Sequence, residues 1–166
     1  HEHDPDGMSA GDELSLAIKR VAKWYQAFPK ADVCIGNHDR LASRKAFSGG
    51  VPKAWIKGYN DVLKTPKWNW VENVTYDNVC YEHGEGGDAY RKAQQNMQSS
   101  VCGHTHTKAG VQFYVGKCYK VFGMQIGCGV NEKSYAAAYA RNFKRQAIGV
   151  GVVLGGNTAI NVLMDL

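Results

Sequence analysis

The sequence contains neither a long apolar run nor a recognisable leader. No stretch approaches the roughly 18 to 20 apolar residues of a membrane helix, and the opening HEHDPDGMSAGDE has no apolar signal-peptide core. We therefore expect a soluble, cytoplasmic protein without a membrane partner. Repeats, low-complexity tracts and linkers are also absent. With 166 residues, 44% of them hydrophobic and 21% charged, the composition predicts a single domain over residues 1–166.

Cysteine pairs of the Cys-x-x-Cys kind are absent as well. The number of cysteines is odd, and most of them lie inside apolar strand-like runs, which is typical of buried thiols in a reducing cytosol. They are Cys34, Cys80, Cys102, Cys118 and Cys128. We interpret none of them as a zinc ligand or a nucleophile.

The first predicted element is an amphipathic helix, and no strand precedes it. Ser9 and Asp12 can cap this helix, which should end before Pro29. Its apolar residues recur at helical spacing: Leu14, Ile18, Val21, Tyr25 and Phe28. A short turn then leads into an apolar strand at 31–36, as in the second half of a β-α-β unit. We therefore expect the first strand of the domain to be missing from this chain.

The remaining pattern predicts a mixed α/β (α+β) protein. Helices are expected at residues 40–47, 52–64, 88–97 and 134–140, and strands at 68–73, 78–84 and 99–102. Two hairpins should follow, one turning near Gly116 and Lys117 and the other through residues 155–158.

Three of the expected strands end in polar clusters that contain histidine. These clusters are residues 36–39 (Gly-Asn-His-Asp), 82–84 (Glu-His-Gly) and 103–106 (Gly-His-Thr-His). Loops at the carboxyl ends of strands in α/β sheets converge on shared sites. Imidazole, amide and carboxylate groups suit Zn, Mn, Fe or Ni, and glycine permits tight turns. The clusters therefore predict a metal site at the strand ends.

The order of these clusters resembles the C-terminal motifs of calcineurin-like metallophosphoesterases. The stretch DPDGMSAGDEL before the first helix is similar to phage and bacterial members of that family. The resemblance covers the chain to about residue 130. It implies a two-sheet β-sandwich flanked by helices, with two metal ions at the strand ends. For a phage-encoded member, it implies the host cytoplasm.

The resemblance also implies a role for each residue. It gives the metal ligands as Asn37, His83 and His104 for one ion and His106 for the other. His38 would protonate the leaving group, Asp39 would orient His38, and Arg40 could neutralise phosphoryl oxygens. Two divalent ions, expected to be Mn with Fe, Zn or Ni as alternatives, would hold the hydroxide that attacks a phosphomonoester or phosphodiester.

Two motifs of the family, Asp-x-His and Gly-Asp-x-x-Asp, do not occur in the sequence. They provide most ligands of one ion and the bridging carboxylate. We therefore expect this chain to be a C-terminal portion with little activity alone. His1, His3, Asp4 and Asp6 are not taken as substitutes. Two other classes stay open: a non-catalytic scaffold or assembly protein on a decayed phosphoesterase fold, and a nucleic-acid-binding module.

The net charge of +5 favours anionic partners such as phosphoesters, nucleotides or nucleic acid. Four cations could contact a polyanionic substrate, but we interpret them as a solvated helix face: Arg44, Lys45, Lys53 and Lys57. We interpret the tryptophans as core or rim packing and not as a stacking platform: Trp24, Trp55, Trp68 and Trp70. Unpaired edges of an incomplete sheet favour a homo-oligomer or association with the missing N-terminal segment.

Overall fold

The computed structural model describes residues 8–130 and 146–165. The chain divides into two compact units, one of His1–Val33 and Asn37–Val71, the other of Cys34–Gly36 and Glu72–Leu166. The single domain expected from the sequence stays a prediction. The expected helix at 134–140 lies outside the described residues, as do His1, His3, Asp4 and Asp6.

The first unit contains the predicted N-terminal helix, α1 (Ala10–Ala27). The hydroxyl of Ser9 caps it as expected, accepting a hydrogen bond from the N–H of Asp12 at 3.1 Å. The half-buried face of α1 contacts α3 (Tyr59–Leu63). The indole N–H of Trp68 donates to the carbonyl of Phe28, at the end of α1, at 2.7 Å. Trp68 belongs to β2 (Trp68–Val71), which pairs with β1 (Ala31–Cys34).

The segment between β1 and β2 contains α2 (Leu41–Ser48), the 3-10 helix η1 (Lys53–Trp55) and α3. The prediction of one helix over residues 52–64 is therefore wrong. Ile56 and Gly58 adopt extended backbone angles, and Gly58 serves as the N-cap of α3. Glycine in a helix interior costs about 1 kcal/mol relative to alanine, so this position favours a break.

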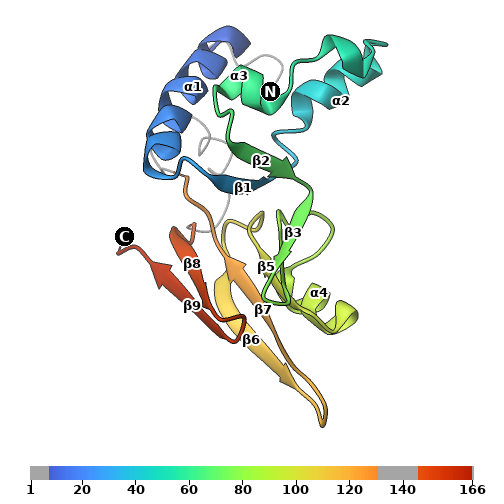
Figure 1. The fold of residues 1–166 in the computed structure, drawn as a ribbon, viewed down its shortest axis with the longest axis vertical. Coiled ribbons are helices and arrows are strands. Elements are labelled where there is room, and N and C mark those ends of the chain that lie inside the picture. Colours follow the sequence, from blue (N-terminus) through green and yellow to red (C-terminus); the bar gives the residue numbers. More distant parts are fainter. Residues whose placement is uncertain (1–7, 131–145, 166) are drawn as a thin grey trace. The chain divides into compact units, whose positions relative to one another are not determined.

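The second unit is built on a five-stranded sheet in the order β3-β4-β5-β7-β6 (Figure 1). The strands are β3 (Asn73–Tyr76), β4 (Val79–Glu82), β5 (Ser99–Cys102), β6 (Ala109–Val115) and β7 (Lys120–Ile126). The three central strands are parallel, and both edge strands are antiparallel to their neighbours. This confirms a mixed α/β protein, whereas the two-sheet sandwich stays a prediction.

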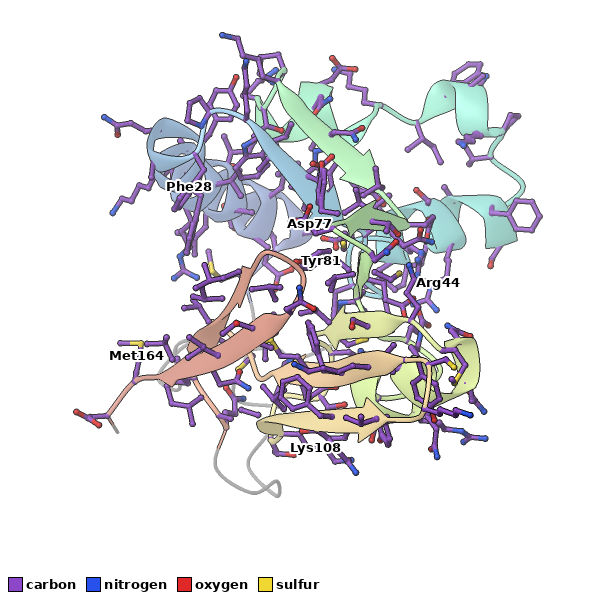
Figure 2. The ribbon with its side chains drawn as sticks, turned by 60° about the horizontal axis from the view of Figure 1, so that its bottom comes forward. Phe28, Arg44, Asp77, Tyr81, Lys108 and Met164 are labelled. Atoms are coloured by element: carbon purple, nitrogen blue, oxygen red, sulfur yellow. The ribbon has the colours of Figure 1, made fainter. Side chains whose placement is uncertain are left out.

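The sequence predicted one strand at 68–73. The structure has β2, which ends at Val71, and a separate strand β3, which begins at Asn73 and was not expected. A two-residue turn at Asp77 and Asn78 joins β3 to β4, and both turn residues have positive φ, 48° and 62°. Positive φ at both positions is the geometry of a type I′ hairpin turn. Figure 2 shows Asp77 at this turn and Tyr81 on β4.

The core lies on both faces of this sheet. Helix α4 (Ala89–Asn96) packs on β5 and β7 through buried Ala89 and Ala93. The hairpin of β8 (Gly149–Leu154) and β9 (Thr158–Leu163) contacts β6 and β7. Side chains along β7 alternate between these layers. A Cβ at Gly123 would meet α4, whereas Met124 lies against Gly151 of β8. The core cluster consists of Val79, Val101, Phe122 and Met124. Both expected hairpins, β6–β7 and β8–β9, are thus confirmed.

Three further expectations concern membranes, cysteines and tryptophans. Within the described residues, no helix is long and apolar enough to cross a membrane. All five cysteines are free thiols; Cys102 is buried, but Cys118 is exposed in the turn between β6 and β7. Trp68 and Trp70 are half-buried, as the packing interpretation requires. That interpretation is wrong for Trp55, which is 83% exposed, because its 3-10 helix leaves the indole largely uncovered.

Candidate functional site

Two of the predicted site residues, His83 and His104, follow adjacent parallel strands. Strands β4 and β5 pair in parallel with Glu82 opposite Cys102, so their carboxyl ends lie side by side. His83 is the next residue after β4, and His104 follows β5 after a single glycine. The topology therefore places both imidazoles at one edge of the sheet, as expected for strand-end clusters.

The two imidazoles contact each other. Nδ1 of His104 lies 2.9 Å from Nε2 of His83, and the rings meet edge to face with centroids 4.8 Å apart. One nitrogen can donate and the other accept, according to the tautomer of each ring. His83 is half-buried and His104 is exposed, so the pair is accessible from solvent.

The backbone at His104 has an uncommon conformation. Its φ is +57°, and the N–H of Thr105 donates to the carbonyl of Gly103 at 2.6 Å, closing a three-residue turn around His104. A three-residue turn with positive φ at its centre is rare and strained for a residue other than glycine. Strained backbone of this kind is concentrated at functional sites.

A buried glutamine supports this turn. The side chain of Gln125, on β7, is fully buried; its amide donates to the carbonyl of Gly103, and its oxygen accepts from the N–H of Ala89 at 3.2 Å. Gln125 therefore links the residue before His104 to the start of α4. Gly84, which follows His83, has φ of +99°, and a Cβ there would lie 2.8 Å from Cβ of Cys102. Glycine is required at this position because the chain after His83 crosses closely over β5.

Two ion pairs lie on the elements that hold the histidines. Nζ of Lys92, on α4, is 2.6 Å from the carboxylate of Glu82, directly before His83. Lys108 is 3.3 Å from the carboxylate of Asp88, the N-cap of α4. The hydrogen bond from the N–H of Arg91 lowers the pKa of Asp88.

Cys102, the last residue of β5, is buried two residues before His104. Its thiol is 3.8 Å from the carboxylate of Glu82. Burial, followed by the charge of Glu82, raises the pKa of the Cys102 thiol to about 12. The thiol is therefore protonated at neutral pH.

The His83–His104 pair has the chemistry of metal ligands but the spacing of a hydrogen bond. Imidazole nitrogens lie about 2.0–2.1 Å from a tetrahedral zinc ion, so two of them are about 3.3–3.4 Å apart. The observed 2.9 Å is shorter, so the two nitrogens would have to separate by about 0.4 Å to hold one such ion. Across residues 8–130 and 146–165, however, no group of three or more His, Cys, Asp or Glu side chains is arranged to hold an ion. The pair would need further ligands.

The other predicted residues are placed as follows. His106 lies in the turn after His104, is exposed, and accepts the N–H of Ala147 through its carbonyl at 2.8 Å. Asn37–Arg40 form a turn that belongs to the first unit, in which His38 and Asp39 are exposed. The hydroxyl of Tyr59 donates to the carbonyl of Asp39 at 3.1 Å and thereby supports this turn.

The residues that the sequence did not predict are Gln125 and Lys92. Gln125 interrupts an apolar strand, and a polar residue at such a position signals a specific buried partner. Lys92 carries no comparable signal, because it lies in an otherwise polar helix.

The chain matches no protein-family model, no curated protein and no solved structure. Any function must therefore be argued from the residues themselves.

Proposed function

We propose that this chain carries part of the active site of a metal-dependent phosphoesterase acting on phosphomonoesters or phosphodiesters. The observation that supports the proposal most is the contact between Nδ1 of His104 and Nε2 of His83 at 2.9 Å. Two histidines that follow neighbouring parallel strands, with ring nitrogens in contact at an accessible edge of the sheet, have the chemistry of a metal site. The order of Gly-Asn-His-Asp, His-Gly and Gly-His-Thr-His along the chain is a second support.

In this proposal each residue contributes one task. His83 and His104 would hold one divalent ion. The resemblance gives Asn37 as a further ligand of that ion and His106 as a ligand of the other. When bound, such ions supply Lewis-acid activation of water and neutralise phosphoryl charge. The imidazolium N–H of His38 donates its proton to the leaving oxygen, and the carboxylate of Asp39 orients that ring. The guanidinium of Arg40 offsets charge on the phosphoryl oxygens.

Metal binding is the decisive measurement, since the family's two N-terminal motifs do not occur in residues 1–166 and turnover by this chain should be low. Histidine-labelled protein is titrated with Zn²⁺ while the imidazole ¹⁵N resonances are recorded. We expect Nδ1 of His104 and Nε2 of His83 to shift together. His104→Ala should weaken binding at least about tenfold and remove the shift of His83.

His38→Ala is the matched control, because it removes an imidazole to which the proposal gives no ligand role. It should leave Zn²⁺ binding unchanged and lower any Mn²⁺-dependent hydrolysis of bis(p-nitrophenyl) phosphate or p-nitrophenyl phosphate. If Zn²⁺ leaves both imidazoles unaffected, the phosphoesterase proposal fails, and the non-catalytic scaffold becomes the better interpretation.

A further inference from the structure

The segment that begins at Arg40, at the end of the Asn37–Arg40 turn, carries only positive charge. Residues 40–60 contain no Asp or Glu, and their cations are Arg40, Arg44, Lys45, Lys53 and Lys57. Elsewhere in the chain the remaining 15 basic residues balance the 15 acidic ones, so this segment accounts for the whole formal charge of +5. A basic surface of this kind raises the local concentration of anionic partners.

These cations lie on and around two short helices, α2 and η1, which contact each other. After α2 the backbone reverses at Gly49 and Gly50, and the N–H of Val51 donates to the carbonyl of Ala46 at 2.9 Å. This reversal brings η1 into contact with α2. We name residues 40–57 the α2–η1 surface; Figure 2 labels Arg44, which lies on it.

Two aromatic side chains are exposed among these cations. Phe47 on α2 and Trp55 on η1 are each 83% exposed, more than any other large hydrophobic side chain in the described ranges. Packing within the unit does not require them, because the inner side of α2 is formed by half-buried Leu41 and Ala46. Aromatic side chains this exposed, close to each other in one unit, indicate a surface that binds a partner.

We propose that the α2–η1 surface binds single-stranded nucleic acid. Bases stack on Phe47 and Trp55, and the lysines and arginines contact the phosphates. Alternating aromatic and basic side chains are the features by which proteins hold single strands without reading their sequence. An anionic membrane would also attract the cations. However, α2 has only eight residues and one exposed aromatic, far less apolar area than helices that lie in a bilayer interface present.

The surface is continuous with the turn to which the proposed function assigns chemistry. The guanidinium of Arg44 donates to the carbonyl of Asn37 at 3.4 Å, and the N–H of Leu41 donates to the carbonyl of His38 at 3.1 Å. A strand held on this surface would therefore present its phosphodiester backbone close to His38. That the bound strand is also the substrate rests on the proposed phosphoesterase function, whereas binding itself does not.

The test is the fluorescence anisotropy of a fluorescein-labelled oligothymidylate titrated with the full chain in EDTA. The double variant Phe47→Ala/Trp55→Ala should weaken binding at least about tenfold, since each stacked base contributes about 1–3 kcal/mol. Trp24→Ala/Phe28→Ala is the matched control. It removes the same residue types from an exposed stacked pair at the C-terminal end of α1, and it should leave binding unchanged.

Charge is tested in the same way. Lys53→Glu/Lys57→Glu should weaken binding and reduce the salt dependence by roughly one to two phosphate contacts, between about 50 and 200 mM salt. Lys19→Glu/Lys23→Glu makes the same charge change on α1 and should have a smaller effect.

Several results would overturn the proposal. One is equal loss of binding in the test and control pairs, and another is polyglutamate competing as well as the oligonucleotide. A third is sedimentation of the chain with phosphatidylserine vesicles together with no oligonucleotide binding, which would assign the surface to a membrane. Because EDTA removes metal from the assay, failure of the Zn²⁺ titration would leave this test intact, and the reverse also holds.

Discussion

The side chain of Gln125 should be needed both for stability and for the geometry of the histidine pair. Gln125→Leu keeps a similar volume but removes both amide groups. The N–H of Ala89 then loses its acceptor, whereas the carbonyl of Gly103 keeps the N–H of Thr105 as a donor. A buried polar group left without a partner costs about 1–3 kcal/mol, and the N–H of Ala89 is one such group, so we expect the free energy of unfolding in urea to fall by about 1–3 kcal/mol. The imidazole ¹⁵N resonances of His83 and His104 should shift as well.

Ser99→Ala provides the matched control for this change. Its hydroxyl accepts from the N–H of Phe122 at 3.1 Å between the same strands, β5 and β7, but at the opposite end from the histidines. It should lower stability by about 1–3 kcal/mol without moving the imidazole resonances. If Gln125→Leu does not fold, Gln125→Glu is the second variant. It keeps the acceptor for Ala89, whereas its ionised carboxylate cannot donate to Gly103 and adds a buried charge there. A folded Gln125 variant with unchanged imidazole resonances would refute the supporting role of Gln125, as would an equal shift in Ser99→Ala.

Four further predictions concern the same unit. Asp88→Ala should lower the free energy of unfolding by about 1 kcal/mol and Asp88→Asn by less, since asparagine can still cap α4; equal losses in urea denaturation would contradict this. Iodoacetamide at pH 8 should modify Cys118 quickly and Cys102 only on unfolding, which peptide mass mapping can check. Burial raises the Cys102 pKa from 9.0 to about 12. The contribution of its protonated thiol to stability is therefore present below pH 9 and is lost as the pH rises toward 12. Cys102→Val should reduce that loss of stability, and an unchanged profile of stability against pH would contradict this. His104→Gly should be more stable than His104→Ala by about 1 kcal/mol, because glycine accepts positive φ without strain; the opposite order in thermal unfolding would exclude the left-handed turn.

Local signals in the sequence predicted local structure well. The cap at Ser9, the helix after Asp88 and the turns of both hairpins depend on residues within a few positions of one another, and all are confirmed. The errors arose where a local pattern was ambiguous. The apolar spacing over 52–64 suited one helix, but the extended backbone from Ile56 to Gly58 divides it. The β3–β4 hairpin was missed although Asp77-Asn78 is a residue pair that tolerates positive φ.

The candidate site was predictable only in part. His83 and His104 each follow a strand, and parallel pairing of neighbouring strands is enough to place them together. The supporting role of Gln125 depends on β7 lying beside β5, a long-range pairing that no local pattern specifies. The exposure of Trp55 depends in the same way on tertiary structure, because nothing in its neighbouring sequence shows whether another element covers the ring.

The conformation of His104 helps to decide between a structural and a functional role for its side chain. A turn that only reversed the chain after β5 would be most stable with glycine at a φ of +57°, since a residue with a side chain costs about 1–2 kcal/mol in the left-handed region. Histidine at this position accepts that cost and places Nδ1 2.9 Å from His83 on the accessible edge of the sheet. Exposure of the His104 ring means that burial of apolar surface offsets little of the strain. The strained turn therefore fixes the position of the imidazole. This favours a functional role for the His104 side chain over a purely structural role in the turn.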